Sequence, residues 1–112
     1  MKDNMKKEER LLKTINLFRH FYPEMQAQTM CIFLHICKVH PKDIPMSELA
    51  DLIGISQASC SRNVALLSSW TRYKTKGPGL VAAFENPMER RSKFVKLTPR
   101  GLSLLNDIKE VL

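Results

Sequence analysis

The first forty residues carry apolar side chains at helical spacing. Residues 5 to 22 place an apolar stripe among charged neighbours, which predicts an amphipathic helix with one buried face. Residues 24 to 40 are apolar on nearly every side, which indicates a second helix in the middle of the core. The stripe of the first segment consists of Leu11, Leu12, Ile15, Phe18 and Tyr22.

Two shorter amphipathic segments follow a proline-bracketed connector in which Ile44 is expected to add a small strand. Residues 46 to 53 predict a helix that Gly54 ends. Ser56 is placed to cap a second helix, expected from residue 57 to about 70. The apolar faces expected to be buried are Leu49, Leu52 and Ile53 on the first of these helices and Cys60, Val64 and Leu67 on the second.

The last third of the chain predicts a hairpin and a final helix. The apolar runs 80–84 and 94–97 each suit a strand, and Asn86-Pro87 turns the chain between them, so a β-hairpin with a basic tip is expected. Thr98-Pro99 is a strong helix start, and an apolar face continues from it to residue 112.

The elements follow one another as in a winged helix-turn-helix. We predict a mainly α fold with a small β-hairpin (α+β), in the order α-α-α-α-β-β-α, within a single domain spanning residues 1–112. Residues 46–70 form the helix-turn-helix and residues 80–97 the wing. The second helix of such a motif can read the major groove of DNA, and a wing can place arginine in the adjacent minor groove.

The net charge of +7 is unevenly distributed along the chain. Residues 62–100 contain nine Lys or Arg residues against two Glu, whereas the rest of the chain has nine residues of each sign. The whole excess therefore lies in the segment that begins at the second helix of the motif. A polyanion is the natural partner of such an asymmetric charge, although a solvated basic face is the simpler alternative.

The candidate DNA-contacting residues lie on that helix and in the wing. Arg62 is the first candidate for base readout, because a guanidinium can donate two hydrogen bonds to guanine; a phosphate contact or an internal ion pair is the alternative. Gln57, Ser59 and Ser61 offer further donors, and Arg91 is the candidate for the minor groove. The candidates for phosphate neutralisation are Arg90, Lys93, Lys74 and Lys76.

The segment NPMERRSKFVKLTPRG, residues 86–101, resembles the wing signature of MarR-type winged-helix transcriptional regulators. In that signature an acid precedes an arginine by two residues, and Leu-Thr-x-x-Gly opens the last helix. Glu89 and Arg91 take the first two places here. The segment ELADLIGISQASCSRNVALL is similar to the family's helix-turn-helix, with Ser61-Arg62 at the usual Ser/Thr-Arg pair, so the resemblance covers roughly residues 23 to 105.

The resemblance implies a cytoplasmic, homodimeric regulator of transcription that binds double-stranded DNA. It implies that Arg91 enters the minor groove while Glu89 helps to hold it through an ion pair. It also implies that helices 5–22 and 99–112 pack against those of a second chain. Small-molecule effectors are common in the family, but no residue here identifies one. The dimer contacts expected on these helices are Leu12, Ile15, Phe18, Leu105, Ile108 and Leu112.

Three features depart from the family's pattern. Glu89 replaces the usual aspartate and has a longer reach, and residues 70–79 are longer than the usual connection between the helix and the wing. The last helix, 99–112, is also shorter than the family's C-terminal dimerisation region. These departures bear on the wing ion pair and the dimer more than on the DNA-binding unit.

The cysteines do not predict a disulfide framework, because there are three of them and no CxxC pair, and this favours a reducing cytoplasm. Cys31 with His35, and Cys37 with His40, have helical spacings that zinc ligands also use. The four do not share one helix face, so core thiols and half-buried imidazoles are the better interpretation, and no metal or cofactor is expected. Neither a membrane-spanning run nor a secretory signal is expected.

Catalysis is not expected, because the sequence contains no glycine-rich phosphate loop, no paired acidic cluster and no nucleophile with a credible base. Two other functions are compatible with the same features. One is a phage- or plasmid-type replication or partition factor that also binds DNA. The other is a winged helix used for protein assembly, whose basic face binds an acidic partner.

Overall fold

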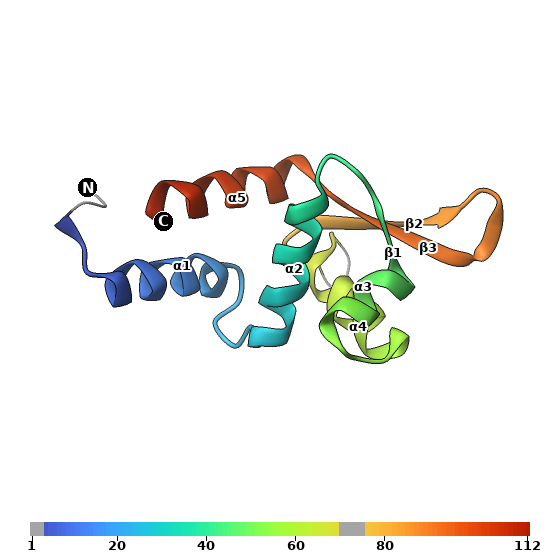
Figure 1. Ribbon diagram of the computed structural model, residues 1–112, viewed down its shortest axis with the longest axis horizontal. Coiled ribbons are helices and arrows are strands. Elements are labelled where there is room, and N and C mark those ends of the chain that lie inside the picture. The colour runs from blue at the N-terminus through green and yellow to red at the C-terminus, as the bar shows by residue number, and fades with distance from the viewer. Residues whose placement is uncertain (1–3, 70–75) are drawn as a thin grey trace.

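The computed structural model describes residues 4–69 and 76–112, which form five helices and a small three-stranded sheet (Figure 1). The predicted mainly helical α+β class and the winged-helix order are therefore confirmed, with the short strand expected at Ile44 as the third strand. The elements in chain order are α1 (Lys7–Phe21), α2 (Ala27–Val39), β1 (Ile44–Pro45), α3 (Met46–Ile53), α4 (Gln57–Leu67), β2 (Val81–Asn86), β3 (Glu89–Leu97) and α5 (Pro99–Val111).

The helix starts and stops with a strong local signal lie where the sequence predicts them. Gly54 follows α3 in the left-handed conformation (φ 82°), which its missing Cβ permits, and its N–H bonds to the carbonyls of Ala50 and Asp51. The Ser56 hydroxyl accepts a hydrogen bond from the Ser59 amide at 3.1 Å and so caps α4. Thr98 caps α5 in the same way, accepting from the Gly101 amide at 3.0 Å.

Three predicted boundaries are wrong by three residues or more. Helix α2 begins at Ala27 instead of residue 24, and hydrogen bonding to other segments explains the other two. Helix α4 ends at Leu67 instead of about residue 70, because Ser68 is extended and the Leu67 carbonyl accepts a hydrogen bond from the Leu80 amide at 2.8 Å. Trp70, where the helix was expected to end, lies outside the described residues. Strand β3 begins at Glu89 instead of residue 94, so most of the predicted basic loop is strand and the turn is only two residues long.

The sheet has the order β1-β3-β2 with antiparallel pairing throughout. Strands β2 and β3 pair regularly from Val81↔Leu97 to Glu85↔Lys93, and the next pair is Asn86↔Glu89. The register therefore advances one residue on β2 but four on β3. Residues 90–92 accordingly form an irregular stretch of β3 near the tip of the wing, which is where bulges re-aim side chains.

Helix α2 lies at the centre of the core, as predicted. Its Ile32, Phe33 and Ile36 are fully buried, and Phe18 of α1 packs edge-on against Phe33 with ring centroids 5.6 Å apart. The expected apolar face of α3 is wrong at one position. Leu52 is 54% exposed, and the buried face of α3 consists of Met46, Leu49 and Ala50.

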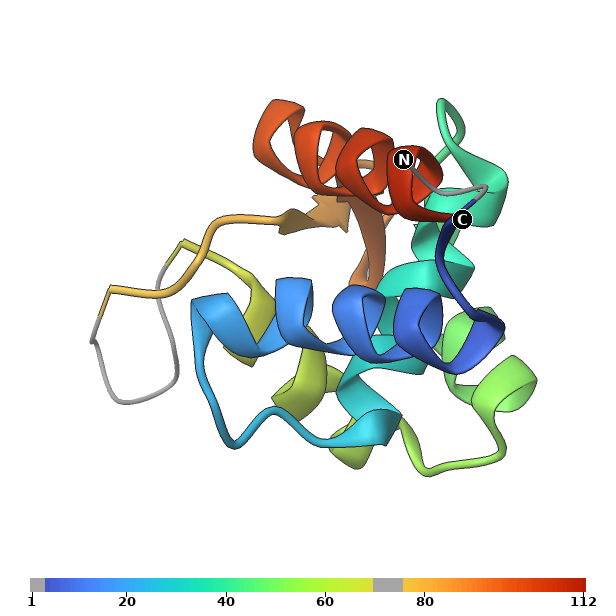
Figure 2. The same ribbon diagram turned by 90° about the vertical axis from the view of Figure 1, so that its left-hand side faces the viewer.

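The molecule is elongated, measuring 50 × 27 × 26 Å. Helices α1 and α5 lie side by side at one end, and the β2–β3 wing extends from the other (Figures 1 and 2). Helices α3 and α4 lie beside the wing, with α2 between them and the α1–α5 pair (Figure 1). Among the described residues, no helix has the length and apolar character needed to cross a membrane.

A junction at Leu80 joins α4, the wing and α5. The Leu80 amide donates to the Leu67 carbonyl at the end of α4, and the Leu80 carbonyl accepts from the Thr98 amide at 3.2 Å. The Thr98 hydroxyl also donates to the Gly79 carbonyl at 2.6 Å. Gly101 allows α5 to approach this junction, because a Cβ at that position would clash with the Leu80 carbonyl oxygen and the Leu97 side chain.

Replacing Gly101 with Ala should therefore destabilise the fold by about 1–3 kcal/mol, because α5 must move away from the sheet to accommodate a methyl group. Urea denaturation followed by circular dichroism measures the change. Ser103→Ala, at an exposed position of the same helix, is the matched control and should shift stability by less than about 0.5 kcal/mol. Equal effects of the two substitutions would contradict the close approach at Leu80.

Candidate nucleic-acid interface

Helix α4 has one buried and one exposed face, in the arrangement that the sequence predicts. Cys60, Val64 and Leu67 are at most 1% exposed, whereas Ser61 and Arg62 lie on the exposed side. Ala58 is exposed on that side too, and sequence reasoning missed it because a lone alanine carries no chemical signal. Small side chains beside an arginine allow another surface to approach the helix closely.

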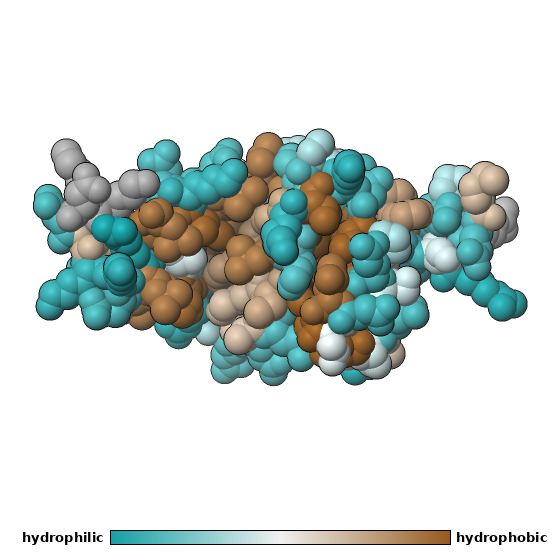
Figure 3. All heavy atoms as spheres, viewed as in Figure 1, coloured by the Kyte–Doolittle hydropathy of each residue, from teal (hydrophilic) through white to brown (hydrophobic). Residues whose placement is uncertain are grey.

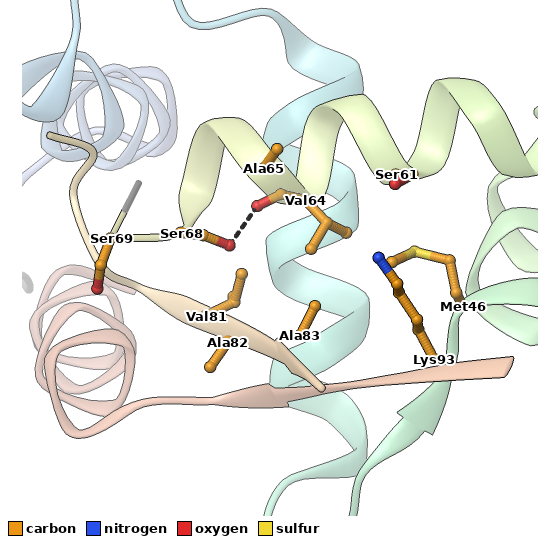
Figure 4. Close-up of a pocket in the computed structure, with 10 residues that line it drawn as sticks. All are labelled: Met46, Ser61, Val64, Ala65, Ser68, Ser69, Val81, Ala82, Ala83 and Lys93. Atoms are coloured by element: carbon orange, nitrogen blue, oxygen red, sulfur yellow. Dashed lines mark hydrogen bonds between the residues drawn. The ribbon is translucent and has the colours of Figure 1, made fainter. Parts of the chain in front are cut away.

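A hollow of about 380 Å³ lies between α4 and the wing (Figure 4). Alternation along β3 explains its basic wall, because Lys93 shares a strand face with the buried Val95 and Leu97. At Lys93 this face of β3 lies opposite α4. The Lys93 side chain therefore points from β3 toward the helix, with Ser61 on the opposite wall of the hollow (Figure 4).

An adjoining hollow of about 280 Å³ brings predicted residues of the helix and the wing together. Gln57 and Ser61 line it from α4, and Arg91 and Lys93 line it from β3. Four of the residues that the sequence assigns to DNA binding therefore share one open surface, although about thirty residues separate the two groups in the chain. Met46, Ser47, Ala58 and Ser92 complete its lining.

Arg62 faces a different hollow, of about 460 Å³, on the side of α4 next to the start of α2. Glu24, Gln26 and Gln28 line the same hollow. Ser59 also lines it, but it is half-buried, and its hydroxyl oxygen accepts a hydrogen bond from the side-chain Nε2 of Gln28 at 3.4 Å. Ser59 is thus tied to α2, unlike the exposed Ser61.

The structure describes only some of the other residues predicted for the wing and its flank. Lys76 is exposed and lines a shallow hollow with Tyr22 and Leu66, on the C-terminal side of α4. Glu89, the acid expected to hold Arg91, lies two residues before it on β3, and both side chains are exposed. Lys74 and the side chain of Arg90 lie outside the described part of the chain.

The six predicted dimer contacts fall into three groups. Leu12 and Leu112 are 59% and 55% exposed, whereas Phe18 and Ile108 are buried in the core of their own chain. Ile15 and Leu105 are half-buried. Exposed apolar side chains nevertheless gather at the end of the molecule formed by α1 and α5 (Figure 3). Leu11 of α1 is also 59% exposed.

A buried polar cluster between α2 and α4 has no counterpart in the sequence analysis. The Thr29 hydroxyl donates to the Asn63 side-chain oxygen at 2.6 Å, and the side-chain Nδ2 of Asn63 donates to the Ser59 backbone carbonyl at 2.8 Å. Tyr22 lies beside Thr29, and burial raises the pKa of its phenol although a hydrogen bond with Thr29 opposes the rise. The only sequence signal was a polar residue on the expected core face of each helix.

The cysteines lie in different environments. Cys60 is fully buried, and burial raises the pKa of its thiol to about 11. Burial also raises the pKa of Cys37 to about 11, partly offset by the nearby positive charge of Lys109. Cys31 is exposed, and with His35 it lines an apolar groove of about 470 Å³ between α2 and α5. No group of three or more His, Cys, Asp or Glu side chains within residues 4–69 and 76–112 is arranged to hold a metal ion.

Alkylation should therefore distinguish the three thiols at pH 7.5. Cys31 should react with iodoacetamide first, because it is exposed, and Cys37 and Cys60 should react slowly, because a raised pKa keeps a thiol protonated and unreactive. Mass spectrometry of timed samples gives the order. Alkylation of Cys60 as fast as that of Cys31 would contradict this assignment.

The unfolded state loses the protons of Cys37 and Cys60 near the ordinary pKa of 9.0 and the folded state only near 11, so the free energy of unfolding should fall as pH rises through that window.

Comparison with known proteins supports the fold and gives no close relative. No family model matches the sequence, and no curated protein matches it. Among solved structures, the chain is similar to a mutant MarR from E. coli in complex with operator DNA, with 19% identity and a TM-score of 0.63 over 93% of this chain and 69% of the other.

Two further structures show the same likeness. BpsR from Bordetella bronchiseptica, described for the regulation of its DNA binding by 6-hydroxynicotinic acid, is 18% identical with a TM-score of 0.60, over 93% of this chain and 73% of BpsR. AbsC from Streptomyces coelicolor, a MarR family transcriptional regulator, is 20% identical with a TM-score of 0.63, over 92% of this chain. The chain spans only 65% of AbsC, less than two thirds of its length. The structure therefore has the winged-helix fold of MarR-type regulators.

Proposed function

We propose that this protein is a sequence-specific regulator of transcription that binds double-stranded DNA as a homodimer, with α4 in the major groove and the wing in the minor groove. The observation that carries the proposal is the surface shared by Gln57 and Ser61 of α4 and by Arg91 and Lys93 of β3. It places neutral hydrogen-bonding groups on the helix next to cationic groups on the wing, which is the division of roles that reading bases while binding phosphates requires.

The exposed face of α4 suits the major groove in shape and in chemistry. The groove is about 12 Å wide and admits one helix, and a helix whose outer face carries Ala58 and Ser61 can approach the bases closely. Arg62 is the one cation on α4, and the helix contains no acid that would repel phosphate. Arg62 is thus the leading candidate for a bidentate contact with guanine.

The wing suits a contact with the phosphates and the minor groove. Arg91 and Lys93 are exposed on β3, which pairs with β2 from Lys93 to Leu97 and with β1 at Phe94 and Val95, so the wing carries its cations on a strand that is anchored in the sheet. Glu89 precedes Arg91 by two residues on the same strand, and we propose that its carboxylate forms the expected ion pair with the Arg91 guanidinium. A narrow minor groove concentrates negative potential, which favours an arginine there.

The exposed leucines at the α1–α5 end support a homodimer. Leu11, Leu12 and Leu112 are each more than half exposed, on the part of the molecule far from the wing. Two copies joined there would present two recognition helices to a pseudo-palindromic site, with half-sites about 34–36 Å apart.

The compared regulators agree with this assignment. MarR was solved with operator DNA, and BpsR responds to 6-hydroxynicotinic acid, which supports operator binding and a small-molecule effector for this chain as well. We likewise propose that the chain is one domain, acts in the cytoplasm and is not an enzyme, as such regulators are.

Selection of bound duplexes from random DNA at physiological salt tests the proposal. The protein should enrich a pseudo-palindromic sequence, because two identical recognition helices read two half-sites. If the selected sequence occurs in a replication origin of the genome and in no promoter, a replication or partition factor is favoured instead. No appreciable binding to any duplex would contradict DNA recognition and favour a winged helix that binds an acidic protein.

Substitution of single cations should separate base readout from phosphate binding. Arg62→Ala should relax the base preference at one position of each half-site, by about 1–3 kcal/mol of discrimination. Lys76→Ala should weaken binding evenly across sequences and reduce the slope of log K against log salt by about 0.9 for each phosphate that is no longer neutralised. Lys109→Ala, on α5 and far from the wing, is the matched control and should change neither quantity. A uniform loss of affinity for Arg62→Ala would assign that residue to the phosphates.

Introducing a charge at the α1–α5 end should separate the subunits. Leu12→Glu places a carboxylate on an exposed apolar side chain of the proposed interface, so sedimentation velocity should show a monomer that binds the full site more weakly than the wild-type dimer does. Leu52→Glu changes an equally exposed leucine on α3 and should leave the sedimentation coefficient unchanged. A Leu12→Glu protein that remains dimeric would place the interface elsewhere.

A further inference from the structure

The contact between α2 and α4 is apolar except at one place. Ile32 and Phe33 of α2 and Cys60 and Val64 of α4 are at most 1% exposed. Thr29 is just as deeply buried, and Asn63 is only 8% exposed. A side-chain amide in such a position costs free energy unless its hydrogen bonds are made, so its presence calls for a specific arrangement of partners.

The partners are arranged so that each polar group of Asn63 is used once. Its side-chain oxygen accepts from the Thr29 hydroxyl at 2.6 Å, and its amide nitrogen donates to the Ser59 carbonyl one turn earlier at 2.8 Å. A neighbouring bond from Gln28 to the Ser59 hydroxyl, at 3.4 Å, joins the same two helices. The link between Thr29 and Asn63 spans 34 residues and is the short, fully buried one.

Hydrogen bonds and apolar contacts constrain a helix differently. Apolar packing is non-directional, and two helix faces can be repacked with only small energetic differences. A hydrogen bond fails when its donor and acceptor move apart by a few tenths of an ångström or lose alignment. The Thr29–Asn63 bond therefore favours one rotation of α4 about its own axis where the surrounding apolar contacts tolerate several.

The rotation of α4 matters because Arg62 is adjacent to Asn63. Side-chain tips lie roughly 5–6 Å from a helix axis, so a rotation of about 20° moves them by about 2 Å. That displacement exceeds the distance range of about 0.5 Å within which an N–H···O bond forms. A base contact by Arg62 would then be broken, while attraction to the phosphates would change little.

We infer that Thr29 and Asn63 are positioning residues that fix the rotation of α4 on α2 and so determine base specificity without contacting DNA. The inference rests on the proposed function and adds a specificity determinant inside the core. It predicts that the pair can be removed with little loss of folding but with loss of sequence discrimination.

The decisive variant is the double substitution Thr29→Val and Asn63→Leu, which replaces both partners with apolar side chains of similar size. Such paired replacements remove the donor and the acceptor of the buried bond together, and Tyr22, which loses its hydrogen bond with Thr29, is only half-buried, so the thermal midpoint should stay near that of the wild type. The ratio of affinities for the selected site and a scrambled duplex should fall roughly tenfold, as for removal of a bidentate base contact. The salt dependence of binding should be unchanged, because every cation remains in place.

Three single variants serve as controls. Thr29→Ser keeps the hydroxyl and should retain the wild-type discrimination between the selected site and the scrambled duplex, whereas Thr29→Val should lose it. Ile32→Val removes one buried methylene from the same contact without touching a hydrogen bond, so it should lower the thermal midpoint and leave discrimination intact. If the double variant does not fold, the comparison of Thr29→Ser with Thr29→Val decides the question in the same way.

The outcomes separate this inference from the proposed function. A wild-type protein that enriches no duplex would overturn the proposed function, and the inference with it. A wild-type protein that selects a site, with a folded double variant that keeps the same discrimination, would overturn only the positioning role. Equal loss of discrimination in Ile32→Val would also overturn it, because the effect would then follow core packing in general.

Discussion

The geometry of the candidate interface depends on the hydrogen bonds at Leu80. Its amide closes the end of α4 through Leu67, and its carbonyl receives the Thr98 amide at the start of α5. Because Leu80 is itself fully buried and directly precedes β2, the base of the wing cannot shift without disturbing both helices. The hydrogen bonds of this one residue thereby fix the angle between the recognition helix and the wing. The hollow that brings Ser61 and Lys93 together is a consequence of that angle.

Features with a local cause were predictable from the sequence, and features with a tertiary cause were not. The Ser56 and Thr98 caps and the stop at Gly54 each depend on a few neighbouring residues, and the structure has all three where they were expected. The end of α4 depends on a hydrogen bond from Leu80, and the start of β3 depends on its pairing with β2 across the two-residue turn, and both predictions failed. In α3 the apolar residues cover more than half of a short helix, so periodicity alone could not decide that Leu52 would be exposed.

The same distinction holds for the candidate site. Residue type and charge identified the cations of α4 and the wing, because arginine and lysine carry their chemistry with them. Sequence could not show that Phe18 and Ile108, assigned to a dimer contact, fill the core of their own chain. Nor could it reveal the Thr29–Asn63 bond, since threonine and asparagine within a helix have no distinctive pattern until a partner 34 residues away is known. Such cross-helix pairs become visible only once two helices are docked.

In the proposed complex, the two cationic elements need different degrees of precision, and their supports differ accordingly. Attraction between a cation and a phosphate falls off slowly with distance, so Lys93 and Arg91 on an extended hairpin can tolerate small displacements. A hydrogen bond to a base edge tolerates only a few tenths of an ångström, and Arg62 lies on a helix that hydrogen bonds from Thr29 and Gln28 join to the central helix of the core. Affinity would then arise mainly from the wing and specificity from the α2–α4 contact. Mutations in the core could therefore alter which sequence is bound without altering how strongly DNA in general is attracted.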